Sequence, residues 1–209
     1  MESGTRRRII ESDEVRELLH HCGAVQQGHF AYASKRHGQT FIDCERLTRH
    51  PRVMQWLGRA IAEWFMSDEI GIVVGIAKGG IVLAQWVAHG LAEFGGAPSR
   101  RMQCASAIFA EREDGAFMFR HGWDEVVSGQ RILVVDDVLN TSGSLWAVTE
   151  LIRACCGKVC GVGVISNRGG IVACALGVPE LFSLADIPLE SWDAAICGLC
   201  AAGMPLITV

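Results

Sequence analysis

The sequence lacks several features that would each place the protein in a particular class. No apolar run is long enough to cross a membrane, and the first residues lack the apolar core of a signal peptide. The formal net charge of −4 at pH 7 provides no basic surface for nucleic acid. No internal repeat, low-complexity tract or long linker interrupts the 209 residues. We therefore expect a cytoplasmic, single-domain protein that binds neither membranes nor nucleic acids.

Two common nucleotide-binding motifs are also missing. The chain has neither the Gly-Lys-Ser/Thr of a P-loop nor the G-x-G-x-x-G of a dinucleotide site. Half of its residues are hydrophobic (50%) and a fifth are charged (20%), which is enough for one substantial core. An anionic ligand would have to be held by local donors, because the chain has no general positive field.

The nine cysteines do not indicate a disulfide framework, because their number is odd and they lie within apolar segments. We expect buried thiols. Cys197 and Cys200 form a Cys-x-x-Cys pair that could supply half of a zinc site. A structural zinc ion needs four ligands, and the sequence shows no clear second pair.

Hydrophobic periodicity predicts strands that alternate with helices. Helical spacing covers 12–22, 51–66, 81–94 and the segment from Leu145, and short apolar runs over 69–76, 102–110, 131–136 and 159–166 predict strands. This order indicates an α/β fold with a parallel sheet. Segments 29–34 and 40–44 predict an antiparallel hairpin with its turn at 35–38, after a turn bracketed by Gly23 and Gly28. The expected buried face of the helix over 51–66 is Val53, Trp56, Leu57, Ala60, Ile61 and Trp64.

The segment from Val134 to Ser144 is the most informative part of the chain. A strand predicted to be buried ends in Asp136 and Asp137, and a polar turn then leads into a helix. Free N–H groups at the amino end of a helix favour an anion, whereas the acids can accept hydrogen bonds from ribose hydroxyls. The pattern favours a sugar phosphate, and an ordinary capped turn is the simpler alternative. The residues of the turn are Asn140, Thr141, Ser142, Gly143 and Ser144.

A second glycine-bearing loop follows the strand over 69–76. Its residues are Ala77, Lys78, Gly79 and Gly80, and its backbone N–H groups could hold another anion with Lys78 as a point charge. A tight turn without a ligand is the alternative. Two anion sites at the carboxyl edge of one sheet suit a ligand with a phosphate at one end and a pyrophosphate at the other.

The segment 134–144 resembles the phosphoribosyl pyrophosphate (PRPP) signature of the type I phosphoribosyltransferases. The resemblance implies an α/β fold with a central, mainly parallel sheet flanked by helices. It also implies a small hood formed by residues 1–45 and 167–209. In that family the two acids bind the ribose 2- and 3-hydroxyls, the polar loop holds the 5-phosphate, and the loop matched by 77–80 binds pyrophosphate.

Residues 15–205 resemble, more closely, a bacterial and archaeal branch of the orotate phosphoribosyltransferases. The likeness lies in the hairpin 29–42, the segment 110–122, Asn167-Arg168-Gly169-Gly170, and the tail 197–205. It implies transfer of ribose 5-phosphate from PRPP to orotate, which forms orotidine 5′-phosphate and pyrophosphate in pyrimidine biosynthesis. It further implies a homodimer with shared active sites. The expected cofactor is Mg²⁺, held mainly through PRPP and, through water, by Asp136 and Asp137.

The resemblance also assigns roles by position. Ser34, Lys35 and Arg168 would bind the base. The catalytic set would be Asp136, Asp137, Arg112, Arg120 and His121, of which the last three lie on the segment 111–122. The charged, glycine-bearing tip of that segment predicts a long mobile hairpin, which in this family would close over pyrophosphate.

Several positions depart from the family pattern. Ser34-Lys35 replaces Ser-Gly, His37-Gly38 replaces His-Ser, Asn140 replaces a threonine, and Asn167-Arg168 replaces Asp-Arg. No lysine occurs between Lys78 and Lys158, so the loop lysine of many orotate enzymes is missing. An arginine can replace its charge, but guanidinium stays protonated and cannot transfer a proton. Two alternatives stay open: a phosphoribosyltransferase for another base or heterocycle, and a PRPP-sensing regulator without catalysis.

Overall fold

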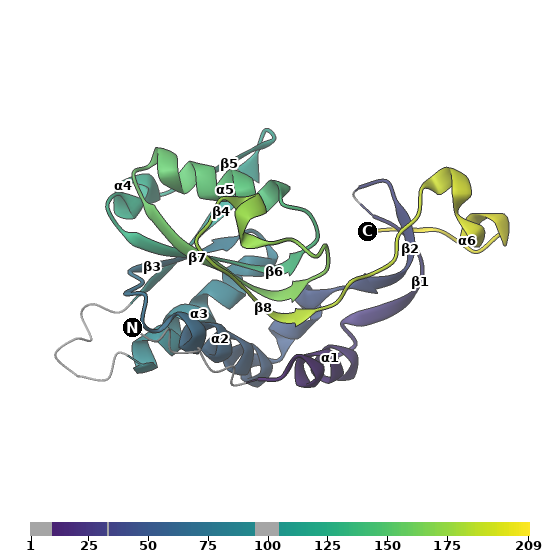
Figure 1. Cartoon of the computed structure of the whole chain (residues 1–209), viewed down its shortest axis with the longest axis horizontal. Coiled ribbons are helices and arrows are strands. Elements are labelled where there is room, and N and C mark those ends of the chain that lie inside the picture. Colours follow the sequence, from purple (N-terminus) through teal and green to yellow (C-terminus); the bar gives the residue numbers. More distant parts are fainter. Residues whose placement is uncertain (1–9, 33, 95–104) are drawn as a thin grey trace.

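The computed structural model describes residues 10–32, 34–94 and 105–209. These residues form a six-stranded sheet with helices on both faces, and a separate three-stranded sheet at one end of the molecule (Figure 1). The predicted start of a strand at 102–104 and the first nine residues of the expected hood lie outside the described residues. None of the described helices combines the length and the apolar character that crossing a membrane requires.

The larger sheet contains β3 (Ile72–Ile76), β4 (Ser106–Glu113), β5 (Ala116–Met118), β6 (Arg131–Leu139), β7 (Lys158–Asn167) and β8 (Leu181–Asp186). The smaller sheet contains β1 (Val25–Ala31), β2 (His37–Ile42) and β9 (Ile207–Thr208). The α-helices are α1 (Ser12–His21), α2 (Pro51–Phe65), α3 (Gly79–Phe94), α4 (Trp123–Val127), α5 (Gly143–Ala154) and α6 (Gly198–Ala201). The short 3₁₀ helices are η1 (Cys44–Arg49), η3 (Ala173–Leu176) and η4 (Ala194–Ile196).

The strand order of the larger sheet is β5-β4-β3-β6-β7-β8. All neighbours are parallel except the edge strand β5, which pairs antiparallel with β4. The predicted α/β class with a mainly parallel sheet is therefore confirmed. The crossover helices place the ends of β3, β6 and β7 at one edge, where each strand passes into a loop.

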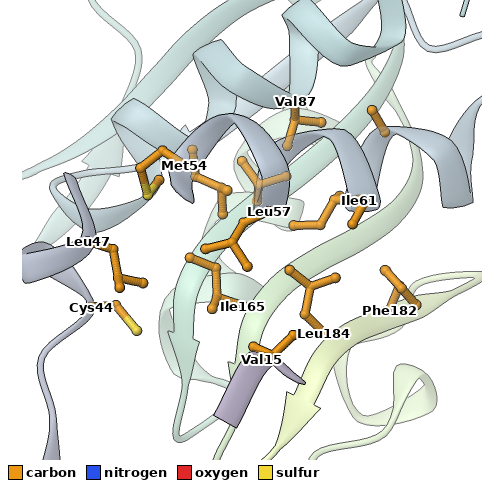
Figure 2. Close-up of a cluster of buried hydrophobic side chains, with 14 of the residues drawn as sticks. Val15, Cys44, Leu47, Met54, Leu57, Ile61, Val87, Ile165, Phe182 and Leu184 are labelled. Atoms are coloured by element: carbon orange, nitrogen blue, oxygen red, sulfur yellow. The ribbon is translucent and has the colours of Figure 1, made fainter. Parts of the chain in front are cut away.

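The core lies on both faces of this sheet, which explains why β3 and the segment 132–135 of β6 are apolar without interruption. In β6, Leu133 and Val135 contribute to the cluster under α2 and α3, whereas Ile132 and Val134 contribute to the cluster under α5. Figure 2 shows the first cluster, in which Leu57 and Ile61 of α2 face the sheet. Each such aliphatic side chain contributes about 1.5–3 kcal/mol when it is fully buried.

The structure corrects several local predictions. Trp56 is 38% exposed although its spacing predicted a buried position, because the buried face of α2 is centred on Met54, Leu57 and Ile61 and Trp56 lies nearly opposite Met54. Gly28 belongs to β1 and not to a turn, and β2 already begins at His37, within the predicted turn. Pairing between the two strands, from Val25 with Ile42 to Ala31 with His37, extends both elements beyond what local signals indicated. The strands β8 and β9 had no sequence prediction.

Candidate active site

The carboxyl ends of β3, β6 and β7 bring the two predicted anion loops side by side. Gly75 of β3 pairs with Val135 of β6, and Leu139 of β6 pairs with Asn167 of β7. The loop 77–80 therefore starts beside the acid pair, and the loop 140–144 starts beside Arg168. We name these two segments, 77–80 and 140–144, the sheet-edge loops.

The loop 77–80 packs tightly against β6, and its glycines make this approach possible. A Cβ atom on Gly80 would lie 2.6 Å from the carbonyl oxygen of Val135. A Cβ atom on Gly79 would lie 2.3 Å from the carboxylate carbon of Asp137. The Ala77 N–H group donates to the Ala110 carbonyl at 2.9 Å, and the Ala77–Lys78 peptide bond is cis. Lys78 is exposed.

Asp136 and Asp137 lie at the edge of the core, each only partly exposed. The Asp137 N–H group donates to Asp136 at 3.0 Å, and the Val138 N–H group donates to Asp137 at 2.7 Å. Burial raises the pKa of Asp136 well above the usual carboxyl value, and the charge of Asp137 raises it further. Burial also raises the pKa of Asp137, against the lowering effect of the hydrogen bond from Val138. Keeping both carboxyl groups ionised therefore costs free energy in the protein alone. Hydrogen bonds from hydroxyl donors, or a bound cation, would lower that cost.

The loop 140–144 ends at the amino terminus of α5. Ser142 occupies the N-cap position, but its side chain makes no capping hydrogen bond. The simpler interpretation of this turn, a capped helix start, therefore lacks its defining bond. The Arg168 N–H group donates to Leu139 at 2.8 Å, and a Cβ atom on Gly169 would lie 2.0 Å from the Asn140 carbonyl oxygen. Backbone contacts thus fix the loop against the end of β7.

Comparison with known proteins identifies the family. The model of the phosphoribosyl transferase domain matches residues 43–170, which include both sheet-edge loops and the acid pair. The chain belongs to the phosphoribosyltransferase family. The orotate phosphoribosyltransferase of Caldanaerobacter subterraneus subsp. tengcongensis is 34% identical over 199 residues, which cover 95% of this chain and 96% of that protein. The Thermotoga maritima orotate phosphoribosyltransferase is 34% identical over 192 residues, with 91% and 94% covered.

Solved structures agree with this assignment. The crystal structure of Mycobacterium tuberculosis orotate phosphoribosyltransferase in complex with Fe(III) dicitrate matches with a TM-score of 0.63 and 26% identity, covering 83% of this chain and 95% of that one. The predicted membership of this phosphoribosyltransferase in the orotate branch is confirmed, and with it the predicted enzyme class, a pentosyltransferase.

Arg168 lies between the two sheets of this phosphoribosyltransferase. It is 8% exposed, and its guanidinium carbon stands 4.0 Å from the centre of the Tyr32 ring. Burial lowers the pKa of Arg168, and the Tyr32 hydroxyl partly offsets this effect. Within the described residues, the Arg168 Nε atom is buried and has no hydrogen-bond partner. An arginine with an unused buried donor beside an aromatic face is suited to a planar, oxygen-bearing ligand.

The hairpin places Ser34 and Lys35 at its exposed tip. The Lys35 N–H group donates to the Tyr32 carbonyl at 2.8 Å, and the Lys35 backbone is left-handed with a φ of 62°. Tyr32 itself points inward, since a Cβ atom on Gly38 would lie 2.1 Å from its hydroxyl. Gly38 therefore replaces the family's serine at a position where the tyrosine leaves no room for a side chain.

The substitution of asparagine for the family's aspartate before Arg168 also has a local explanation. The Asn167 amide donates to the Ile171 carbonyl at 2.8 Å, and its oxygen accepts from the Ile171 N–H group at 3.1 Å. An aspartate carboxylate could accept but could not donate. Asn167 thus closes the turn that follows β7.

The three catalytic residues predicted on the segment 111–122, namely Arg112, Arg120 and His121, contact neighbours of their own segment or of α4 in this structure. Arg120 pairs with Glu111 and with Glu113, the latter at 2.7 Å, and these hydrogen bonds raise the pKa of Arg120. The Arg112 guanidinium lies 4.7 Å from the Phe117 ring centre, and the His121 ring lies 5.3 Å from that of Trp123. The predicted strand-like arms are present as β4 and β5, with the turn at Asp114 and Gly115.

The cysteine prediction holds only in part. Cys22, Cys44 and Cys197 are buried, but Cys156, Cys174 and Cys200 are exposed, and Cys104 lies outside the described residues. Burial and the neighbouring acids, chiefly Asp137, raise the pKa of the Cys44 thiol. The exposed thiols occupy turns and short helices at the ends of apolar segments, where composition alone overestimates burial.

Proposed function

We propose that this phosphoribosyltransferase transfers ribose 5-phosphate from PRPP to a ring nitrogen of orotate, releasing pyrophosphate and forming orotidine 5′-phosphate. The observation that carries the proposal is the packing of the loop 77–80 against Asp137, beside the loop 140–144, at one sheet edge. Curated relatives named orotate phosphoribosyltransferase, at 34% identity over nearly the full chain, support the choice of acceptor.

The loop 140–144 would hold the 5-phosphate of PRPP. It stands at the amino end of α5, where N–H groups without helical partners and the helix dipole favour an anion. Ser142 supports the role because its hydroxyl makes no cap and is left for a ligand. Thr141 and Ser144 would add hydroxyl donors.

The loop 77–80 would hold the pyrophosphate, through its backbone N–H groups and the exposed Lys78. Asp136 and Asp137 would accept hydrogen bonds from the ribose hydroxyls and, when ionised, favour the positive character that grows on the sugar as the C1–oxygen bond breaks. These carboxylate oxygens also fit Mg²⁺, which prefers such ligands directly or through water. When bound, the ion would supply charge neutralisation for the leaving pyrophosphate.

The base would bind between the two sheets. Arg168, with its buried Nε atom and its contact with Tyr32, is suited to hold a carbonyl or carboxylate of orotate. Ser34 and Lys35, at the tip of the same hairpin, would complete the pocket from the side of the solvent. The small sheet, with segments from 10–45 and 167–209, would thus act as the hood.

The hairpin 111–122 would act as a lid. Arg112, Arg120 and His121 would leave their present contacts and close over pyrophosphate. In a homodimer, some of these residues would come from the neighbouring subunit. Closure would exclude water and limit hydrolysis of the reactive sugar.

We also place the enzyme in the cytoplasm, a proposal supported by the free thiols of the described cysteines.

A pyrophosphate-release assay tests this function directly. The protein is supplied with PRPP and Mg²⁺ and with a panel of pyrimidines, purines and other nitrogen heterocycles. We expect release with orotate and a nucleotide product of the mass of orotidine 5′-phosphate. Release with another base and not with orotate would identify that base as the acceptor. PRPP binding with no release for any base would instead favour a regulator.

A further inference from the structure

A second cluster of reactive side chains lies away from the sheet edge, in the small sheet and the C-terminal segment. His29 of β1, His37 at the start of β2, and Cys197 and Cys200 at α6 each offer one ligand atom, and these four atoms all lie within 4.8 Å of one another. We propose that these residues bind a structural zinc ion that fastens the C-terminal segment to the hairpin.

Four of the six distances between the ligand atoms are close to those of a tetrahedral ion. With Zn–N bonds of about 2.0–2.1 Å and Zn–S bonds of about 2.3 Å, the edges of the tetrahedron are about 3.4 Å between nitrogens and about 3.6 Å between nitrogen and sulfur. In the structure, His29 Nε2 lies 3.2 Å from His37 Nδ1. The Cys197 sulfur lies 3.4 Å from His29 Nε2, and the Cys200 sulfur lies 3.7 Å and 3.3 Å from the two histidine nitrogens.

The local backbone aims these side chains at one point. The pairing of β1 with β2 shifts register between Gln27 and Phe30, so that two residues, Gly28 and His29, stand opposite one. Such a bulge redirects the bulged side chain. Cys197 is the N-cap residue of α6, and the turn that follows brings Cys200 back beside it. The position of His37 is set by paired hydrogen bonds with Trp192, both 2.8 Å.

The surroundings of His29 support a metal role. Its Nδ1 atom lies 3.0 Å from the Met204 carbonyl oxygen, so Nδ1 carries the proton and Nε2 presents its lone pair to the cluster. Zinc-binding histidines commonly donate their other ring N–H group in this way. Binding balances charge, because two thiols release two protons and the two thiolates neutralise Zn²⁺.

The C-terminal segment has little else to hold it. Residues 201–209 are all exposed, and β9 and α6 contain only two and four residues. Leu206, Ile207 and Val209 are 47%, 49% and 40% exposed. A segment that buries so little apolar surface needs another source of stability, which a four-ligand zinc ion provides.

Metal analysis of the purified full-length protein, kept reduced and supplied with zinc, tests the proposal. We expect one zinc ion per chain in the wild-type protein and in Cys174→Ser, a matched control at another exposed cysteine. Cys200→Ser should lower zinc affinity by at least about 100-fold, the upper range for losing even an indirect partner of a metal ligand. X-ray absorption should show two sulfur and two nitrogen neighbours.

Two outcomes of the metal analysis would overturn the proposal. The first is a wild-type zinc content no higher than that of a Cys197→Ser/Cys200→Ser variant. The second is stoichiometric zinc that Cys200→Ser retains unchanged. Hydrogen exchange gives a readout that does not depend on enzymatic activity: removing zinc with a chelator should increase exchange in 193–208 and leave β6 protected. Equal exchange with and without zinc would rule out a fastening role.

Discussion

The sheet edge and the small sheet position their functional groups by different means. At the sheet edge, loops that follow neighbouring parallel strands are held by backbone contacts, such as Gly80 against Val135. In the small sheet, side chains far apart in the chain meet, as Cys197 and His29 do across 168 positions. That a loop follows each strand end can be read from local sequence, whereas the meeting of the side chains in the small sheet depends entirely on how distant segments are brought together.

The largest effect is expected at the sheet edge. Asp137→Asn should lower kcat by about 10²–10³-fold, comparable to the loss of one preorganised charge-stabilising group. The fold should persist, because asparagine can still accept the hydrogen bond from Val138. Steady-state assays with PRPP and orotate, with circular dichroism of the variant, measure both parts. Asp13→Asn, at an exposed position in α1, is the control. An unchanged kcat in Asp137→Asn would show that this aspartate of the acid pair does not contribute to catalysis.

The lid should contribute less, because it is a third region that must move to act. The double substitution Arg112→Ala/Arg120→Ala should slow the chemical step by about 10²-fold through lost charge stabilisation. Single-turnover measurements at saturating PRPP isolate this step. Glu113→Gln is a useful partner variant, because it weakens the pairing that holds Arg120 within the hairpin. A wild-type single-turnover rate in the double variant would exclude the lid role.

A smaller effect should arise where the two regions meet. Tyr32→Leu should lower kcat/KM for the base by about 10-fold, since a cation–π contact is worth about 0.5–2 kcal/mol and this one positions Arg168. Tyr32→Phe keeps the ring and should stay close to the wild type. The comparison is made with orotate varied at saturating PRPP. Equal losses in both variants would assign the effect to the hydroxyl and not to the ring.

The smallest effect concerns stability. The raised pKa of Asp136 means that the folded state holds its proton more tightly than the unfolded chain does. Stability should therefore fall as pH rises from the unfolded value of about 3.9 towards the raised folded value. Asp136→Asn should remove this loss and raise Tm at neutral pH, by about 2–4 °C for each kcal/mol regained. Thermal scans from about pH 4 to about pH 7 test this explanation, and parallel changes in the Tm of the two proteins across that range would contradict it.

Much of the sheet edge could be predicted from the sequence. Apolar runs that end in Asp136-Asp137 and in a glycine-rich loop indicate strand ends, and parallel strands place their carboxyl ends together. What the sequence could not show is that Gly79 lies directly against Asp137, because this contact depends on the register between β3 and β6. The role of Tyr32 was also missed, although it is the single tyrosine of the chain.

The second half of the proposed zinc site was missed for a similar reason. Cys197 and Cys200 carry a recognisable spacing, but His29 and His37 do not, because they meet only across a hairpin with a bulge. The sequence by itself determined the family, the order of the strands and helices from α1 to β7 apart from the short α4, and the residues of the sheet-edge loops, since each depends on short-range pattern. The tertiary structure decided which distant side chains share a site, because that depends on strand register and on packing between segments that local propensity does not encode.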